Sequence, residues 1–255
     1  MMKITAIIPA RYGATRFPGK LLAKLSSKPI IQWVYEGARQ CSLLNQIIIA
    51  TDHKAIYETA RGFGAEVQMT SPNHQTGTDR IAEVAEGIAA DIVVNLQADE
   101  PFMEGSIISL AVEPFLQEPS LLMGTLKTHI RSSNELLDPN IVKVVTDCYD
   151  FALYFSRSPI PYFRDGWPEP PPISNHVFKH IGVYVYRKDF LLKFARLPQS
   201  PLEKAEKLEQ LRVLENGYKI KVINCPYQGI GIDTPEDLKK AETLWQQLRK
   251  PTVYP

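Results

Sequence analysis

The chain alternates short apolar runs with longer amphipathic segments, and this alternation limits the folds open to it. The apolar runs predict buried strands at Ile4–Ile8, Gln46–Ala50, Glu66–Met69 and Asp91–Leu96. The segments between them predict helices at Lys28–Cys41, Lys54–Gly62 and Thr78–Ile88. Strands and helices in this order form a mostly parallel sheet with helices on both faces, so the predicted class is α/β. Ligands of such sheets bind beyond the carboxyl ends of the strands, here after Ile8, Ala50 and Leu96.

The second half of the chain is less regular. Further strands are predicted at Leu122–Thr128, Val142–Thr146, Ala152–Ser156, Val177–Arg187 and Lys219–Asn224. The prolines between Pro159 and Pro172 predict a long loop. A capping box at Ser200–Glu203 predicts one helix that runs to about Gly217, and Thr234 opens a final helix.

Length and composition set broad limits. A chain of 255 residues fits one large domain, and we expect a single domain over residues 1–255. The net charge of +1 does not favour nucleic acid as a partner. No apolar stretch approaches the roughly 20 residues that span a bilayer, so we expect no membrane insertion. The three cysteines are far apart in sequence, which fits reduced thiols in a soluble, cytoplasmic protein.

The loop after the first strand is rich in cations. It carries Arg11, Arg16 and Lys20, together with Gly13 and Gly19. Glycines let the backbone approach a phosphate, and three cations suit a triphosphate and a departing pyrophosphate. The loop matches neither the Walker A pattern nor G-x-G-x-x-G. From residue types alone, a solvated basic loop with turn glycines is an equally good interpretation.

Carboxylates follow the other strands. Asp52 and Asp99 come after the second and fourth strands, and Asp233 precedes the final helix. Asp99 is a candidate magnesium ligand, because this hard cation prefers oxygen ligands and phosphates. Asp52 and Asp99 also have structural interpretations as helix caps, which leaves both roles open on chemistry alone, and the run after Asp233 has one as well, with Thr234 as the cap.

Several stretches resemble a known family. Ile7-Ile-Pro-Ala-Arg-Tyr-Gly-Ala-Thr-Arg-Phe-Pro-Gly-Lys20 is similar to the N-terminal signature of sugar nucleotidyltransferases, and more narrowly of the 3-deoxy-manno-octulosonate cytidylyltransferases. Further blocks resemble that family in the expected order: Ala50–Asp52, Met69–Arg80, Asn95–Pro101, Ala152–Pro161, Lys179–Arg187, Glu209–Arg212 and Gly231–Asp237. Ala98 stands where the family usually has glycine. Because alanine disfavours positive φ, this substitution raises a question about the shape of the Asp99 loop.

The resemblance implies roles for individual residues. The catalytic set is Lys20, Arg11, Asp99 and Asp233, of which Asp99 and Asp233 would bind the metal. The nucleotide-binding set is Ala10, Arg11, Arg16, Lys20, Thr51, Asp52, Thr78, Arg80 and Asp99, with Thr78 also a candidate cap of its helix. The sugar-binding set is Gln97, Arg157, His180, Tyr184, Glu209 and Gln210. Arg157 could instead be a structural ion-pair partner, and His180 with Tyr184 could form a half-buried polar face.

The resemblance also implies a fold and a reaction. The fold is a Rossmann-like sheet of the nucleotide-diphospho-sugar transferase type, with a sugar-binding and dimerisation subregion at about residues 125–190. The reaction joins CMP from CTP to 3-deoxy-D-manno-octulosonate for lipopolysaccharide synthesis, with magnesium as cofactor and pyrophosphate as second product. The family implies a homodimer, and we expect its contact at Leu137–Pro172. Two alternatives remain: another sugar acid (8-amino or sialic), or a protein that senses CTP without chemistry.

Overall fold

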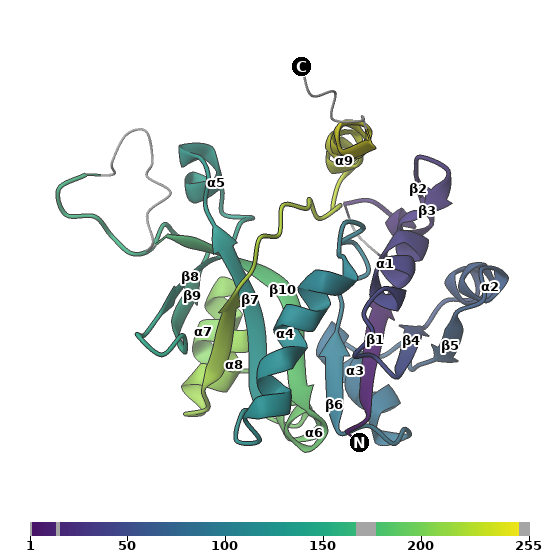
Figure 1. Cartoon of the computed structure of the whole chain (residues 1–255), viewed down its shortest axis with the longest axis horizontal. Coiled ribbons are helices and arrows are strands. Elements are labelled where there is room, and N and C mark those ends of the chain that lie inside the picture. Colours follow the sequence, from purple (N-terminus) through teal and green to yellow (C-terminus); the bar gives the residue numbers. More distant parts are fainter. Residues whose placement is uncertain (1, 14–15, 167–176, 250–255) are drawn as a thin grey trace. The chain divides into compact units, whose positions relative to one another are not determined.

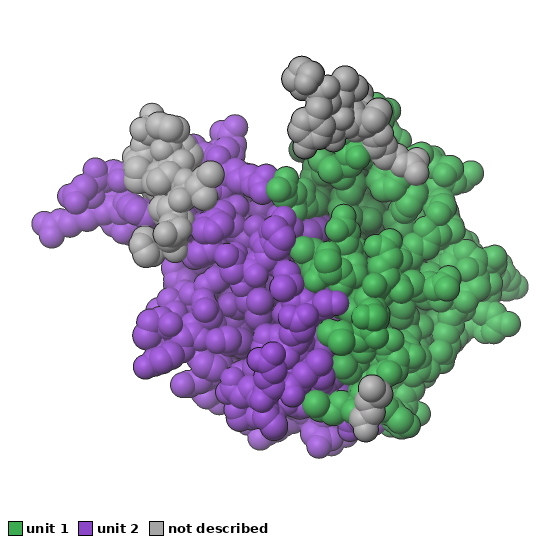
Figure 2. Space-filling model, viewed as in Figure 1, with its two compact units in different colours: residues 1–90, 95–108, 228–255 green, residues 91–94, 109–227 purple. Residues whose placement is uncertain are grey.

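The computed structural model describes residues 2–13, 16–166 and 177–249. The chain divides into two compact units, coloured separately in Figure 2. Unit 1 comprises residues 1–90, 95–108 and 228–255, and unit 2 comprises residues 91–94 and 109–227. The C-terminal segment therefore returns to the unit in which the chain began. The subregion predicted at about 125–190 belongs to unit 2, and its role stays a prediction.

Unit 1 has a parallel core of β1 (Ile4–Ala10), β4 (Gln46–Thr51) and β5 (Glu66–Met69), in the order β1-β4-β5. The connecting helices are α1 (Ile30–Arg39), α2 (Lys54–Gly62) and α3 (Gly77–Glu86). β1 is buried almost throughout, as expected of a strand covered on both faces. α2 packs against β4 and β5 (Figure 1). The predicted alternation of strands and helices is confirmed.

The C-terminal part of unit 1 adds a second small core. α9 (Pro235–Arg249) and the pair β2 (Lys24–Leu25) and β3 (Lys28–Pro29) contribute to it, next to the 3-10 helix η1 (Lys20–Leu22). Leu25, Ile30 and Ile232 are fully buried there, with Trp33 and Trp245 packed around them. This cluster fixes the segment 228–235, which carries one of the candidate carboxylates.

Unit 2 has a mixed sheet in the order β11-β7-β10-β6. β7 (Met123–His129) runs parallel to β11 (Ile220–Asn224) and antiparallel to β10 (Phe178–Arg187). β8 (Lys143–Thr146) pairs with β10 and with β9 (Ala152–Ser156), while β6 (Ile92–Asn95) borders β10. The helices are α5 (Ser133–Leu137), α6 (Lys188–Ala195), α7 (Pro201–Glu206) and α8 (Gln210–Glu215), and α4 (Gly105–Gln117) leads in from unit 1.

Two helix predictions need correction. The single helix expected from Ser200 to about Gly217 is two helices, because Lys207 adopts a left-handed conformation with φ of 55° and ends α7. Thr78 lies inside α3, whose cap is Thr76, with Asp79 completing the capping box. The predicted loop 159–172 has neither helix nor strand over 159–166, and its remainder lies outside the described residues. No helix in the described part of the chain combines the length and apolar character needed to cross a membrane.

The segment that follows Asp99 packs directly against α1. A Cβ on Gly37 would lie 2.0 Å from the Met103 carbonyl oxygen, and one on Gly105 would lie 2.4 Å from the Gln40 carbonyl carbon. Both contacts involve backbone, which cannot swing aside as a side chain can. Glycine is therefore required at both positions, and the close approach holds the Asp99 loop against the first helix.

We expect Gly37→Ala to lower the free energy of unfolding by about 2–3 kcal/mol, because the added methyl group must push two backbones apart. Urea unfolding followed by circular dichroism measures this. Gly62→Ala is the matched control, since Gly62 lies in α2 and a Cβ added there would meet no neighbouring atom within 4 Å. That variant should be neutral or stabilise by up to about 1 kcal/mol. Equal effects of the two variants would contradict the close-packing argument.

Candidate functional site

The parallel ladder of unit 1 brings the candidate loops to one edge. Ala10, the last residue of β1, lies opposite Thr51, the last residue of β4. Leu96 N–H donates to the Ile7 carbonyl at 3.2 Å, which aligns the chain after β6 with β1. Arg11, Asp52 and Gln97 therefore all leave the sheet at the same edge, as the sequence predicted.

Lys20 is the centre of the candidate site in unit 1. Its Nζ lies 2.6 Å from Asp99 Oδ2 and 2.7 Å from Asp233 Oδ1. Arg16 Nη2 adds a contact of 2.8 Å to Asp233 Oδ2. Burial by itself would lower the pKa of Lys20, but Asp99 and then Asp233 outweigh it, so the pKa lies above its ordinary value. The ammonium group is therefore charged and joins three loops that are far apart in sequence.

Backbone bonds hold the two carboxylates in place. Ile232 N–H donates to the Asp99 carbonyl at 2.9 Å, so the segments that carry Asp99 and Asp233 are bonded to one another. Glu100 N–H donates to the Gln97 carbonyl at 3.3 Å, which turns the loop after β6. The non-glycine residues with positive φ in the described residues are Ser26, Asp150 and Lys207. Ala98 is not among them, so this loop accepts alanine in place of glycine.

Asp99 and Asp233 fit the donor set of a magnesium ion. One cationic atom already contacts both carboxylates, so their oxygens converge on a single point. No group of three or more His, Cys, Asp or Glu side chains within the described residues could enclose a metal. A two-carboxylate site suits magnesium, which usually takes its remaining ligands from water and substrate phosphates. A metal at this point has to exchange with the Lys20 ammonium group.

Arg80 and Asp52 form a buried pair beside this site. Arg80 Nη2 donates to Asp52 Oδ2 at 2.7 Å, and Nη1 donates to Thr70 Oγ1. Only 3% of Arg80 is exposed. Both ends of its guanidinium group are thus bonded within unit 1. The structure gives Arg80 a part in holding the ends of β4 and β5, and its predicted contact with the nucleotide stays a prediction.

Of the remaining nucleotide candidates, three are buried and one is exposed. Thr51 is fully buried, and its Oγ1 accepts from His53 N–H at 3.2 Å. Ala10 and Thr78 are buried at the end of β1 and in the first turn of α3. Arg11 is exposed on the loop. These residues lie at the predicted edge, and their contacts with a nucleotide stay predictions.

Three of the sugar candidates form a polar cluster in unit 2. The Tyr184 hydroxyl group donates to Gln210 Oε1 at 3.2 Å, and the rings of His180 and Tyr184 lie 5.3 Å apart. The Gln210 Nε2 group is buried without a hydrogen-bond partner among the described residues. Such an orphaned donor is costly unless something else binds it, so it marks this cluster as a candidate ligand site.

His180 is held in one tautomer. The Thr125 hydroxyl group donates to the Val183 carbonyl at 2.7 Å, so its oxygen accepts from His180 Nε2 at 2.8 Å. Burial lowers the pKa of His180 to about 3, and burial together with the charge of Glu209 raises the pKa of Tyr184. Both side chains are therefore neutral near pH 7. Thr125 was missed from the sequence, because it lies 55 positions from His180 on another strand.

Arg157 and Glu209 are the other sugar candidates in unit 2, and Gln97 lies in unit 1. Arg157 Nε donates to the Glu206 carbonyl at 2.7 Å, and Nη1 donates to the Pro139 carbonyl at 2.9 Å. The side-chain carboxylate of Glu206 also accepts from the backbone N–H of Arg157 at 3.0 Å, a contact that the sequence did not suggest. Glu209 is the N-cap residue of α8. Neutral carbonyls orient the guanidinium group without cancelling its charge, which leaves it suited to an anion.

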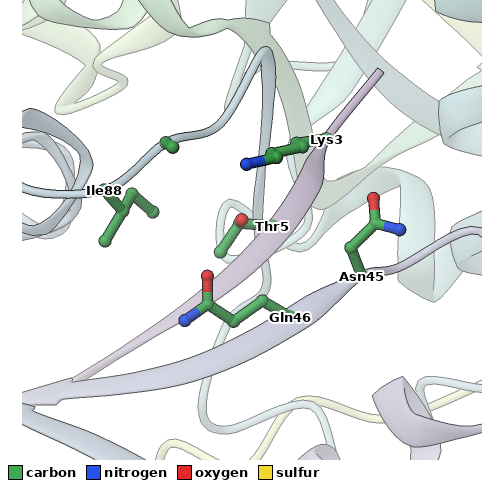
Figure 3. A pocket seen from close by; sticks show the side chains of 6 residues that line it. Lys3, Thr5, Asn45, Gln46 and Ile88 are labelled. Carbon is green, nitrogen blue, oxygen red and sulfur yellow. The ribbon is translucent and has the colours of Figure 1, made fainter. Parts of the chain in front are cut away.

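A pocket of about 460 Å³ lies elsewhere in unit 1 and is lined by Lys3, Thr5, Asn45, Gln46, Ile88 and Ala89 (Figure 3). Thr5 and Gln46 are opposite one another at the start of the β1–β4 ladder. The candidate loops follow its other end, five residues later, or roughly 16 Å along the strand. The pocket is therefore separate from the site around Lys20.

Known proteins are similar to this chain over most of its length. The cytidylyltransferase family model matches residues 5–220. A 3-deoxy-manno-octulosonate cytidylyltransferase of Geobacter metallireducens is 54% identical, over 94% of this chain and 96% of the relative. One of the same name from Solibacter usitatus is 50% identical, over 96% of this chain and 95% of the relative.

Solved structures are also similar. A structure described as CMP:2-keto-3-deoxy-manno-octonic acid synthetase complexed with CTP has a TM-score of 0.90 and 40% identity, and the match covers 96% of this chain and 99% of that chain. A cytidylyltransferase from Leptospira borgpetersenii has a TM-score of 0.61 at 17% identity, with all of both chains covered. The second comparison supports the fold alone.

We expect His180 to make stability fall on mild acidification. Its folded pKa of about 3 lies below its ordinary value of 6.5, so folding excludes a proton. The stabilisation is complete above pH 6.5 and is lost as the pH falls towards 3, at up to about 1.4 kcal/mol per pH unit. Urea unfolding of wild type and His180→Gln at pH 7, 6 and 5 measures it. Parallel pH profiles of the two proteins would contradict the assignment.

Proposed function

The chain belongs to the 3-deoxy-manno-octulosonate cytidylyltransferase family, and on that premise we propose that it transfers CMP from CTP to 3-deoxy-D-manno-octulosonate. Pyrophosphate is the second product. The observation that carries the proposal is the convergence of Lys20, Asp99 and Asp233, which come from three distant segments of the chain. Two carboxylates and a lysine at the edge of a parallel sheet suit a bound triphosphate.

The reaction is a displacement at the α-phosphorus of CTP. The anomeric hydroxyl group of the sugar attacks this phosphorus, the new O–P bond forms, and the bond to the bridging oxygen breaks. The oxygen that bridges the α- and β-phosphorus atoms keeps the electron pair of the broken bond and leaves as part of pyrophosphate, while the hydroxyl proton passes to solvent water. Lys20, Arg11 and Arg16 would stabilise the charge on pyrophosphate, because cations beside a leaving group offset its developing negative charge.

Asp99 and Asp233 are the residues that would hold magnesium. When bound, magnesium would supply Lewis acidity at the phosphate oxygens and favour ionisation of the attacking hydroxyl group. Lys20 would then exchange its carboxylate contacts for contacts with the phosphates. In this proposal, the ammonium group orders the two carboxylates before substrate arrives and neutralises pyrophosphate afterwards.

The polar cluster of unit 2 supports the sugar assignment. Neutral His180 and Tyr184, together with the Gln210 Nε2 group that has no partner among the described residues, offer hydrogen bonds to hydroxyl groups. Arg157, oriented by two carbonyls, offers a planar fork for the carboxylate of a sugar acid. Gln97 and Glu209 remain proposed sugar contacts.

We propose further that the chain works as a cytoplasmic homodimer in lipopolysaccharide synthesis. Support for the dimer comes from large apolar side chains that unit 2 exposes: Leu137 at 63%, Leu153 at 62% and Tyr162 at 83%. These residues lie within the proposed contact segment, Leu137–Pro172, of which 167–172 are outside the described residues. Exposed apolar groups in one region are typical of protein interfaces.

The substrate is tested by pyrophosphate release. The protein is mixed with CTP, magnesium and one of three sugars: 3-deoxy-D-manno-octulosonate, its 8-amino analogue, or sialic acid. We expect the highest kcat/KM with the first. Faster turnover with another sugar would replace the proposed substrate, and CTP binding with no pyrophosphate from any sugar would favour the sensor.

The metal role is tested by Asp99→Asn, which keeps the shape of the side chain but removes its charge. We expect turnover to fall roughly 100-fold or more, because a group that stabilises transition-state charge is lost. Asp237→Asn is the matched control. Partial burial tends to raise the pKa of Asp237, but hydrogen bonds from Thr234 and Asp233 lower it overall, as expected of a helix cap.

The control variant should lose roughly 1 kcal/mol of stability and keep its turnover within a few-fold of wild type. A manganese titration followed by electron paramagnetic resonance, in the presence of CTP, should show weaker binding only for Asp99→Asn. Normal manganese binding and normal turnover in Asp99→Asn would refute its role as a metal ligand.

A further inference from the structure

Two aromatic rings meet where the loop that carries Arg11, Arg16 and Lys20, called the cation loop below, passes the end of β4. The rings of Tyr12 and His53 are stacked, with centroids 3.9 Å apart and an angle of 13° between their planes. Tyr12 belongs to the loop after β1, and His53 follows β4. The parallel pairing of Ala10 with Thr51 brings these two segments side by side.

Tyr12 also closes the loop that carries the cations. Gly19 N–H donates to the Tyr12 carbonyl at 3.2 Å, so residues 12 and 19 are bonded across the loop. The Tyr12 phenol covers Gly19, since a Cβ there would lie 3.3 Å from its hydroxyl oxygen. Gly19 has φ of 70° and is followed directly by Lys20. The position of Tyr12 therefore determines where the chain turns into Lys20.

His53 is a rigid support for this ring. The imidazole Nδ1 accepts from the Ala55 N–H at 3.2 Å and caps α2. The backbone N–H of His53 donates to Thr51 Oγ1 at 3.2 Å. Its carbonyl accepts from Tyr57 N–H at 3.1 Å. These contacts at the first turn of α2 fix the imidazole plane, so the stack ties the cation loop to a helix end.

Core packing does not account for Tyr12. The residue is 37% exposed, whereas the core aromatics of the chain, such as Phe115 and Phe155, are fully buried. A ring that is partly exposed gains less from the hydrophobic effect than a fully buried one. What it does form is a directed contact with one ring and one glycine, both at the edge where the candidate site lies.

We propose that Tyr12 and His53 are positioning residues, a stacked pair that holds the cation loop in the conformation that binds the triphosphate of CTP. This inference rests on the proposed function. Without the stack, the loop spends part of its time in other conformations, and CTP must select the competent one. The apparent affinity then falls in proportion to the competent fraction, while the bound complex is unchanged. The effect should therefore appear in KM for CTP rather than in kcat.

Four variants separate the stack from the cap. Tyr12→Ala removes the stack, and Tyr12→Phe keeps the ring without the hydroxyl group. His53→Asn removes the ring but keeps a side chain that caps helices well, whereas His53→Phe keeps a ring and loses the cap. Phe63→Ala is the control, because Phe63 contacts Tyr35 at the other end of α2, with ring centroids 5.5 Å apart.

We expect Tyr12→Ala and His53→Asn to raise KM for CTP roughly three- to tenfold, the range that aromatic pair energies allow, with kcat within threefold of wild type. Tyr12→Phe should keep the wild-type KM. His53→Phe should lower the melting temperature with a smaller rise in KM than His53→Asn, because it keeps a ring and the backbone contacts of residue 53 with Thr51 and Tyr57. Phe63→Ala should lower the melting temperature with KM nearly unchanged. Titration calorimetry with CTP and magnesium, without sugar, should show the same pattern in Kd.

A wild-type KM in both Tyr12→Ala and His53→Asn would overturn the inference. So would an equal rise in KM for Phe63→Ala, since that result would mean a general loss of structure. These outcomes differ from failure of the proposed function, in which wild-type protein itself releases no pyrophosphate from CTP with any of the sugars.

Discussion

The parallel ladder between β1 and β4 is the constraint on which the candidate site depends. Its register places Ala10 opposite Thr51, so the loops after both strands begin at the same edge. The chain after β6 joins that edge through the bond from Leu96 to Ile7. Parallel strands need crossovers, and those crossovers are the helices α1, α2 and α3. The cation loop, the Asp52 turn and the Asp99 loop are neighbours for this reason.

At that edge, electrostatics arranges the side chains before any ligand is present. Lys20 pairs with two carboxylates at once, Arg16 pairs with one of them, and the buried Arg80 pairs with Asp52 at the same edge. Partly buried charges of this kind are tolerated because each has its partner. In the proposed reaction, a triphosphate with a metal would replace these contacts, because it would offer an anion to Lys20 and a cation to the two carboxylates. In unit 2, the neutral cluster of His180, Tyr184 and Gln210 offers hydrogen bonds instead of charge.

Local patterns predicted most of the elements. β5, α2 and β9 have the predicted bounds, because apolar periodicity and end signals agree there. The errors arose where the folded chain departs from the structure that a local sequence pattern predicts. Lys207 ends α7 because it adopts a left-handed conformation, which few residues other than glycine adopt. The residues on either side of it could have continued the helix. Buried Leu208 follows directly, so packing decides this break. Thr76 rather than Thr78 caps α3, since Asp79 closes the box from the third position.

The sequence by itself determined the α/β class and, through resemblance, the family, and it predicted the edge of the sheet at which the candidate residues gather. It also contained every residue of the ion-paired site as a separate motif. Only the tertiary structure decided that Lys20 joins Asp99 and Asp233, which lie 79 and 213 positions away, and that Thr125 orients His180. The physical reason is the distance along the chain over which each signal acts. Periodicity, caps and turns depend on neighbours within a few residues. A contact between distant loops depends on strand register and on backbone approaches such as that of Gly37 to Met103.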